Sequence, residues 1–293
     1  MSVSGINFVC AGRDELEIPR EIVEQGGFHF PDLHSDSQEM ARLALAIKLN
    51  KRNSICMLPF CLTVEAEALG ARVNLGNASS GPRISSHSYE SIEQLKDLRM
   101  VDFNSGRIKS VLDAVETLTQ SGEVVALNVS GPFTLTTSLL DPMVLYKAVK
   151  KNREAIDDVL SIIEEIMLRY ILEAIKRGAR IISYADAVGS ADMVGPKMYK
   201  DISGTASLNL LKRLQTSDEL DGCIVHICGK TSVSLEKHGF ARSYPIEVSS
   251  NQTYGQAIAE LLNKSEGSRF IGHNCMKRTV NKLKDNTVWR IKF

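Results

Sequence analysis

The feature that most constrains the fold is a repeated alternation between short apolar runs and longer segments with helical periodicity. The runs are rich in β-branched residues and occupy residues 54–60, 123–129, 180–184, 223–228, 244–248 and 269–273. Continuous runs of this kind are typical of parallel strands that helices bury on both faces. The sequence therefore predicts an α/β protein, built either as an open doubly wound sheet or as a closed barrel.

The positions of the reactive side chains favour the barrel. Several of them come at or just after the ends of different predicted strands: Asp186, His226, Cys228, Glu247 and Cys275. Side chains from the carboxyl ends of many strands converge in a barrel, whereas in an open sheet they converge only at a switch point. The first strand is not followed by a GxGxxG loop. We therefore expect one TIM-like (β/α)8 barrel domain over residues 1–293, with residues 1–50 as a helical or irregular lead-in.

Composition limits the partners. The 293 residues carry 35 basic and 35 acidic side chains, so the net charge is zero and offers no overall basic field for nucleic acid or a membrane surface. The apolar runs fall far short of the roughly 18 residues that span a bilayer, and the N-terminus lacks a signal-peptide pattern. We expect a cytoplasmic protein that binds neither nucleic acid nor a membrane. Its oligomeric state stays open, with a homodimer as one possibility.

The sharpest chemical signal is His226-Ile227-Cys228 at the end of a predicted strand. Residues two apart on a strand point to the same face, so the imidazole and the thiol would project together. Gly229 lets the backbone turn away directly after them. With Cys275, which closes another short strand, they form the kind of three-ligand set that holds zinc with an open fourth position. The alternative is ordinary burial, because cysteine is among the most buried residue types.

The remaining cysteines are interpreted as structural. Six cysteines in a chain of this length are too few for a disulfide-stabilised domain, and free cysteines serve as core residues, metal ligands or nucleophiles. Those that we assign to structure are Cys10, Cys56, Cys61 and Cys223.

Four segments between about residues 50 and 280 resemble the uroporphyrinogen-decarboxylase superfamily, and within it the methylcobamide:coenzyme M methyltransferases. They are PFCLTVEAEALGARVNLG at 59–76, VSGPFTL at 129–135, ISYADAVGSADMVGPKMY at 182–199 and HICG at 226–229. The last resembles the family's zinc motif, whose third ligand is a distant cysteine. The resemblance thus implies that His226, Cys228 and Cys275 bind Zn²⁺.

The resemblance also implies a mechanism. Zinc binds the acceptor thiol and lowers its pKa, so that a thiolate is present at neutral pH. That thiolate attacks the methyl group of a methylated corrinoid (cobalamin) carried by a separate corrinoid protein. The implied function is a zinc-dependent methyltransferase that uses a small-molecule thiol such as coenzyme M as acceptor. The identity of the thiol stays open.

The fourth zinc position has two candidates. The resemblance implies a resting glutamate ligand on the next strand, which the substrate sulfur displaces, and Glu247 matches that position by order. His273 is the alternative that the residues themselves suggest, because it repeats the His-x-Cys pattern with Cys275. We prefer Glu247.

Two acidic residues are predicted to be catalytic. Asp186 follows a predicted strand, where an aspartate in a barrel is more often a site residue than a solvated one. Glu65 and Glu67 are two residues apart on a predicted helix, so only one can face the site, and Glu65 is nearer the strand end. The alternative is that both are solvated charges behind Thr63 as helix N-cap.

The sequence departs from the family pattern at one point, and three other functions are alternatives. The stretch between Cys228 and Cys275 is shorter than in the family, so a βα unit is missing or Cys275 lies on the seventh strand. We expect a barrel shortened near its C-terminus.

The other functions are a methylcorrinoid:tetrahydrofolate-type transferase, a uroporphyrinogen decarboxylase and a non-catalytic zinc-binding corrinoid-partner protein. An arginine-rich decarboxylase motif is absent from the N-terminal sequence, and a folate nitrogen needs no soft metal.

Overall fold

The computed structural model describes residues 8, 18–264 and 270–293, so that Cys10 lies outside the described residues. One seven-stranded sheet has the order β1-β4-β5-β6-β8-β9-β7, and β2 and β3 form a separate antiparallel pair. The strands of the large sheet are β1 (Cys56–Leu58), β4 (Val125–Ser130), β5 (Ile181–Ala185), β6 (Ile224–Cys228), β7 (Arg242–Glu247), β8 (Phe270–Asn274) and β9 (Thr287–Lys292). The small pair is β2 (Arg72–Asn74) and β3 (Arg83–Ser86).

Helices of three to 24 residues alternate with these strands. The larger ones are α1 (Arg20–Gly26), α2 (Ser37–Asn50), α5 (Gly106–Gln120), α6 (Pro132–Leu139), α7 (Pro142–Lys151), α8 (Arg153–Lys176), α11 (Gly204–Gln215), α12 (Gly229–Lys237) and α13 (Tyr254–Asn263). The shorter ones are η1 (Asp32–Ser35), α3 (Val64–Ala68), α4 (Ile92–Leu95), α9 (Ala191–Val194), α10 (Pro196–Met198), η2 (Tyr199–Ser203), η3 (Asp218–Leu220) and η4 (Met276–Arg278). Within the predicted lead-in, the described residues form α1, η1 and α2.

The five strands β1, β4, β5, β6 and β8 are parallel, as the apolar runs predict. The prediction that every run is buried on both faces is wrong for β7. This strand pairs antiparallel with β9, and most of its residues are exposed or half-buried. β9 itself runs antiparallel to β8.

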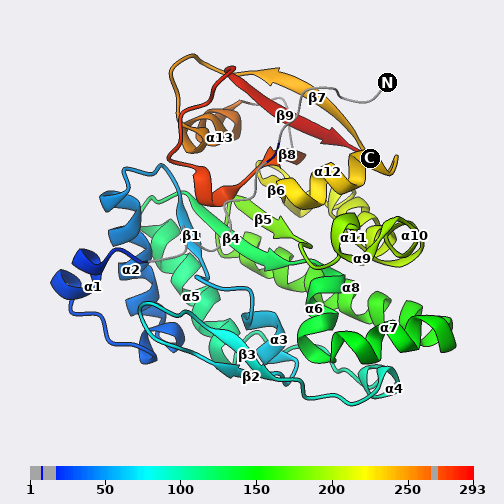
Figure 1. Ribbon diagram of the computed structural model, residues 1–293. Helices are drawn as coiled ribbons and strands as arrows, with labels where there is room; N and C mark the ends of the chain where they lie inside the picture. Colours follow the sequence, from blue (N-terminus) through cyan, green and yellow to red (C-terminus); the bar gives the residue numbers. More distant parts are fainter. Residues whose placement is uncertain (1–7, 9–17, 265–269) are drawn as a thin grey trace.

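Alternate residues of the parallel strands pack against different helices. Leu127, Ile182 and Val225 belong to the larger apolar cluster, which includes α2, α5, α8 and α11. Their neighbours along the strands, such as Ala126 and Ile181, pack instead against α13. Figure 1 shows α13 together with β7, β8 and β9 on one side of strands β1, β4 and β5, and α5 and α8 on the other side of these strands.

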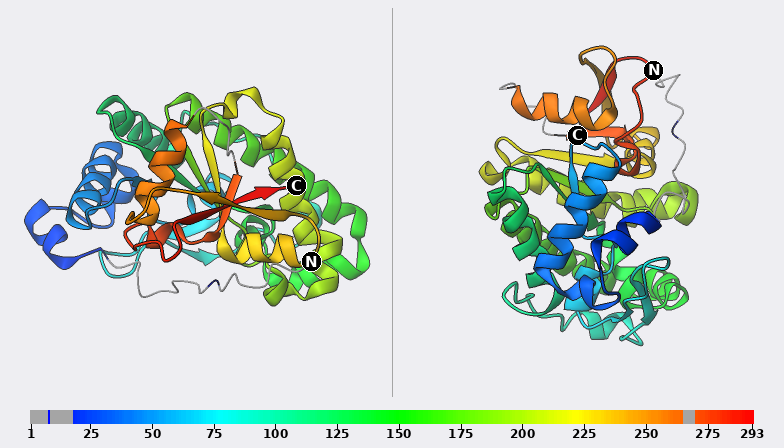
Figure 2. Two further views of the ribbon diagram at one scale, coloured as in Figure 1. Left: turned by 90° about the horizontal axis from the view of Figure 1, so that it is seen from above. Right: turned by 90° about the vertical axis from the view of Figure 1, so that its left-hand side faces the viewer.

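The placement of α13 differs from a regular barrel. A helix that follows a barrel strand packs on the outside, but α13 covers the inward-facing residues at the start of β4, β5 and β6. The views in Figure 2 agree that α13 and the β7–β9 pair lie together over the sheet. The α/β barrel-like class is thus confirmed. Among the described residues, β1 and β7 end the sheet and do not pair with each other.

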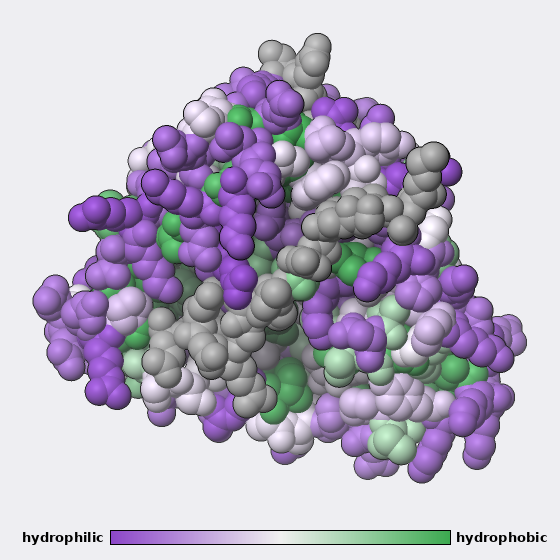
Figure 3. Space-filling model, turned by 45° about the horizontal axis from the view of Figure 1, so that its top comes forward, coloured by the Kyte–Doolittle hydropathy of each residue, from purple (hydrophilic) through white to green (hydrophobic). Residues whose placement is uncertain are grey.

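The described ranges contain no helix with the length and apolarity that crossing a membrane requires. Hydrophilic residues cover most of the face in Figure 3, with apolar residues in small separate areas. The large apolar side chains that are exposed lie on different segments and are Leu49, Met100, Met143, Met193 and Tyr244. They do not mark a single docking surface.

Candidate active site

The inward face of the parallel strands carries a layer of polar side chains. Asn128 on β4 pairs in register with Ser183 on β5, which pairs with His226 on β6. Because strand residues alternate between faces, Cys228 shares the inward face with His226 one step nearer the carboxyl end. That His226 and Cys228 project together remains a prediction from this alternation, and the pairing of β6 with β8 is irregular between the two residues.

His226 is buried without a hydrogen-bond partner. Its side chain is 1% exposed, and neither Nδ1 nor Nε2 has a partner among the described residues. Burial lowers the pKa of the imidazole to about 4, so the ring is neutral at pH 7. A neutral imidazole with an open nitrogen is the form that binds a metal ion. Because leaving a buried polar group unpaired costs about 1–3 kcal/mol, these nitrogens point to a missing partner.

Cys275 lies close to Cys228 in the sheet. Cys228 pairs in register with Asn274 on β8, and Cys275 is the next residue. Both cysteines are half-buried and neither is in a disulfide. Within the described ranges, however, no three His, Cys, Asp or Glu side chains are grouped closely enough to hold a metal ion. Imidazole and thiol are donor types that bind zinc, but these three side chains lie farther apart than the ligands of a metal centre.

His273 is fully engaged in other contacts. Its Nδ1 is 3.2 Å from the Ser232 hydroxyl, and its Nε2 contacts the Ser243 hydroxyl and lies 3.0 Å from Glu236 Oε2. Burial lowers the pKa of His273, and the charge of Glu236 opposes that shift. His273 therefore ties β8 to α12 and β7, and neither ring nitrogen is open to a metal.

Glu247 lies apart from the two cysteines. It is exposed on β7 and pairs with Thr287 of β9, so that β9 separates it from β8. The structure does not bring Glu247 together with His226, Cys228 or Cys275.

Asp186 follows β5 and is buried with its carboxylate saturated. Oδ1 accepts from the Thr134 backbone N–H at 2.8 Å and from the Thr134 hydroxyl at 2.7 Å. Oδ2 accepts from the Phe133 N–H at 3.3 Å and from the Ser207 hydroxyl at 2.8 Å. Burial raises the pKa of Asp186, while these hydrogen bonds lower it. Asp186 therefore anchors the first turn of α6 to β5 and α11.

Gly131 makes this anchor possible. A Cβ at Gly131 would lie 2.1 Å from the Cβ of Asp186, so a larger residue would displace the carboxylate. The GPFT turn that begins α6 is thus shaped around Asp186.

Glu65 is buried and Glu67 is not, in agreement with the expectation that only one faces inward. Glu65 is 3% exposed, and its Oε1 accepts from the Ser130 N–H at 2.9 Å. Its Oε2 has no partner among the described residues, and burial raises the pKa of this carboxyl. Glu67 instead pairs with Arg107. Thr63 occupies the N-cap position of α3, as interpreted, but its hydroxyl contacts Cys61 and Arg107 and makes no capping hydrogen bond.

Sequence reasoning missed Tyr254, Asn128 and Ser183. The ring of Tyr254 at the start of α13 lies edge-on to His226, with centroids 5.7 Å apart. Burial raises the pKa of Tyr254, and Asn274 and Cys275 lie near enough to its hydroxyl to affect it. The inward placement of Asn128 and Ser183 could have been found from strand alternation, but the contact of α13 has no local signal.

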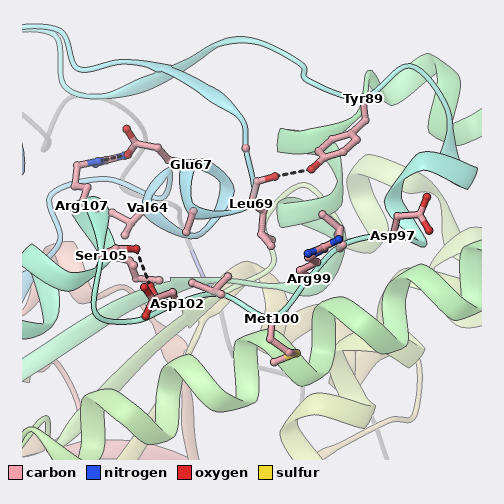
Figure 4. A pocket seen from close by; sticks show the side chains of 16 residues that line it. Val64, Glu67, Leu69, Tyr89, Asp97, Arg99, Met100, Asp102, Ser105 and Arg107 are labelled. Carbon is pink, nitrogen blue, oxygen red and sulfur yellow. Dashed lines mark hydrogen bonds and ion pairs between the residues drawn. The ribbon is translucent and has the colours of Figure 1, made fainter.

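A separate cavity of about 600 Å³ opens between α3, residues 97–105 and the start of α5. Figure 4 shows the Glu67–Arg107 pair at one side of it and Tyr89, whose hydroxyl donates to the Leu69 carbonyl at 2.8 Å, at the other. The cavity walls do not include His226, Cys228 or Cys275.

The fold and these side chains define an α/β barrel-like protein with soft donor atoms near the carboxyl ends of its strands. The chain belongs to the uroporphyrinogen decarboxylase (URO-D) family, whose sequence model matches residues 12–261. It is 27% identical to the methylcobamide:CoM methyltransferase MtaA of Methanosarcina barkeri and 25% identical to the methylcobamide:CoM methyltransferase MtbA of Methanosarcina acetivorans. Each match covers 73% of this chain and 63% of the relative, so the chain spans less than two thirds of their length.

A solved structure supports the fold. A methyltransferase from Methanosarcina mazei superposes with a TM-score of 0.62 at 23% identity, over 71% of this chain and 60% of that one. At this identity the likeness establishes the architecture alone.

Proposed function

We propose that this protein transfers a methyl group from a methylated corrinoid, carried on a partner corrinoid protein, to a small-molecule thiol such as coenzyme M. The names of the relatives support corrinoid-dependent methyl transfer to a thiol. The observation that carries the proposal is the buried His226, whose ring nitrogens both lack a partner among the described residues, on the same strand face as Cys228.

We assign zinc binding to His226, Cys228 and Cys275. Imidazole and thiolate are the ligands that zinc prefers, and a three-ligand set leaves one position for substrate. Zinc bound there would lower the pKa of the acceptor thiol, so that the thiol reacts as a thiolate at neutral pH. Assembling this set requires the ends of β6 and β8 to draw the three donors closer together.

The surrounding residues would position and shield this centre. Tyr254 covers one side of the His226 ring and excludes water from it. Asp186 fixes the start of α6 beside the carboxyl ends of β4 and β5 through its four hydrogen bonds, and thus acts as a positioning residue. Glu65, with one unpaired oxygen and a raised pKa, is our candidate for a group that holds and exchanges a proton.

Metal analysis with ligand variants tests the assignment. Purified protein should hold about one zinc per chain, and Cys228→Ala and Cys275→Ala should each lose it while remaining folded. Cys223→Ala is the matched control, because Cys223 directly precedes β6 and lies at the opposite end of the strand from Cys228. Full zinc retention in both ligand variants would exclude the site.

An activity assay tests the reaction itself. The zinc-loaded protein should demethylate free methylcobalamin when a suitable thiol is present, and a panel with coenzyme M and homocysteine would identify the acceptor. Zinc binding without transfer to any thiol would favour a non-catalytic corrinoid-partner protein.

A further inference from the structure

Cys61 lies in an environment unlike that of a structural cysteine. It follows β1 on the carboxyl-end side of the sheet and is half-buried. Arg107 Nη1 and the Thr63 hydroxyl each lie 3.3 Å from its sulfur. Arg107 Nη2 also donates to the Thr63 hydroxyl oxygen at 2.8 Å, and Arg107 Nε pairs with Glu67.

The direction of these hydrogen bonds favours an anionic sulfur. Arg107 has only donors, so its contact with Cys61 requires the sulfur to accept. The Thr63 oxygen already accepts from Arg107, which directs the Thr63 proton toward the sulfur as a second donor. Two donors, one of them charged, stabilise a thiolate more than a thiol.

Unpaired polar atoms in the same cluster point to a bound polar molecule. Glu65 Oε2 and Tyr170 Oη have no partner among the described residues, although the two side chains are 3% and 1% exposed. The charges of Glu65 and Cys61 both raise the pKa of Tyr170, and that of Arg107 lowers it, so these four groups lie within electrostatic range. Burial and the charge of Arg107 lower the pKa of His34 to about 4, and its Nε2 has no partner among the described residues.

We propose that Cys61 is a nucleophilic thiolate that undergoes exchange with small-molecule disulfides. The Cys61 sulfur attacks one sulfur of the disulfide, a new S–S bond forms, and the disulfide's own S–S bond breaks. The released half leaves as a thiolate and takes a proton from water, so no further oxidant is needed. The product is a mixed disulfide on Cys61, which a reduced thiol reverses.

Cys56 and Cys223 provide an internal comparison for Cys61. Cys56 is buried, and burial together with the charge of Glu123 raises the pKa of its thiol to about 12. Cys223 is also buried, and its sulfur faces the Ala179 carbonyl oxygen at 3.6 Å, a contact that favours the protonated thiol. Both thiols are buried, whereas reactive cysteines need to be accessible.

The test is incubation of the purified protein with 2-hydroxyethyl disulfide at pH 6, 7 and 8, followed by mass spectrometry of the intact protein and its peptides. Cys61 should gain one half of the disulfide, at least about tenfold faster than Cys56 or Cys223, and dithiothreitol should remove it.

Variants distinguish the effect of the two donors, Arg107 and Thr63, from a general loss of structure. Arg107→Gln and the nearly isosteric Thr63→Val should each slow the reaction about tenfold at pH 7. Glu67→Gln is the control, because Glu67 contacts Arg107 and not the sulfur; it should not slow the reaction. Cys61 that remains unmodified, or a rate that is unchanged in a folded Thr63→Val, would overturn the proposal. These readouts require no methyl transfer, so they stand apart from the proposed function.

Discussion

The rings of His226 on β6 and Tyr254 on α13 meet edge to face, with centroids 5.7 Å apart and planes inclined by 66°. Each ring is buried, and the two nitrogens of His226 have no hydrogen-bond partner among the described residues. An apolar contact thus holds one side of the imidazole, while its nitrogens stay available. Unpaired buried nitrogens lower the free energy of unfolding, but they can bind a metal ion.

His226→Leu should therefore stabilise the metal-free protein while abolishing zinc binding. The substitution removes two buried nitrogens without partners, a gain of about 1–3 kcal/mol in the free energy of unfolding. Urea unfolding of both proteins in a chelator would measure it, with zinc content determined separately. Tyr254→Phe is the control for the ring contact and should retain zinc. A large loss of stability in His226→Leu would show that the imidazole is bonded in the metal-free state.

Asp186→Asn should lower both stability and turnover. Its carboxylate accepts four hydrogen bonds, and an amide NH₂ group cannot accept those on its side. We expect a loss of about 2–4 kcal/mol in unfolding free energy, since donors at the start of α6 are left buried and unpaired. We also expect turnover to fall by more than about tenfold.

A comparison with Ser207→Ala identifies how Asp186 acts. Ser207 on α11 donates to Oδ2 and accepts from the Tyr184 hydroxyl, whereas the turn at the start of α6 donates to Asp186 through Phe133 and Thr134. A positioning role for Asp186 predicts a smaller loss of turnover in Ser207→Ala, in proportion to its smaller loss of stability. Normal turnover in Asp186→Asn would assign the residue to structure alone.

Glu164 on α8 should make stability depend on pH. Burial raises its pKa from 4.5 to about 7, and the charge of Arg213 only partly offsets that effect. Between these values the folded protein keeps a proton that the unfolded chain has released, so stability falls as pH rises from about 4.5 to about 7. The fall is at most about 3 kcal/mol.

Glu164→Gln should remove this dependence. The variant should match the original protein near pH 4.5 and be more stable by about 1–3 kcal/mol at pH 8, measured by urea unfolding at several pH values. Glu165→Gln is the neighbouring control, because Glu165 is partly exposed and pairs with Arg169 and Arg213. A pH profile that is identical in the two variants would contradict the assignment to Glu164.

The sequence predicted the parallel strands, because they depend on local periodicity. The shared face of His226 and Cys228 is a prediction from the same periodicity. Burial of β4, β5 and β6 on both faces requires continuous apolar runs, and the two-residue period sets which side chains point inward. The sequence did not reveal β2 and β3, whose residues are mostly exposed and lack an apolar pattern.

The features that the sequence did not predict depend on contacts between distant segments. The antiparallel return of β9 decides where α13 packs, and nothing in the pattern of residues 254–263 distinguishes the two faces of the sheet. For that reason Tyr254 was not expected near His226. The burial of Glu65, by contrast, followed from its place next to the end of β1, although the separate role of Glu67 with Arg107 did not.

The last prediction concerns the fourth zinc position. Our proposal assigns it to Glu247, because both ring nitrogens of His273 are engaged by Ser232, Ser243 and Glu236. Glu247 is exposed on β7, so it can reach the centre only if the end of β7 moves toward β8. A carboxylate is a harder ligand for zinc than a thiolate, so the substrate sulfur should displace it, and a proton is released as the thiol ionises.

X-ray absorption on the resting protein and on its thiol complex would test this exchange. We expect the zinc shell to gain one sulfur and lose one oxygen when the thiol binds. Glu247→Gln should keep zinc, more weakly, and change the pH dependence of thiol binding. Glu236→Gln, which alters the contacts of His273 and Ser243, should leave that dependence unchanged. A resting shell of two sulfurs and two nitrogens would instead identify His273 as the ligand, and would mean that zinc breaks its contacts with Ser243 and Glu236.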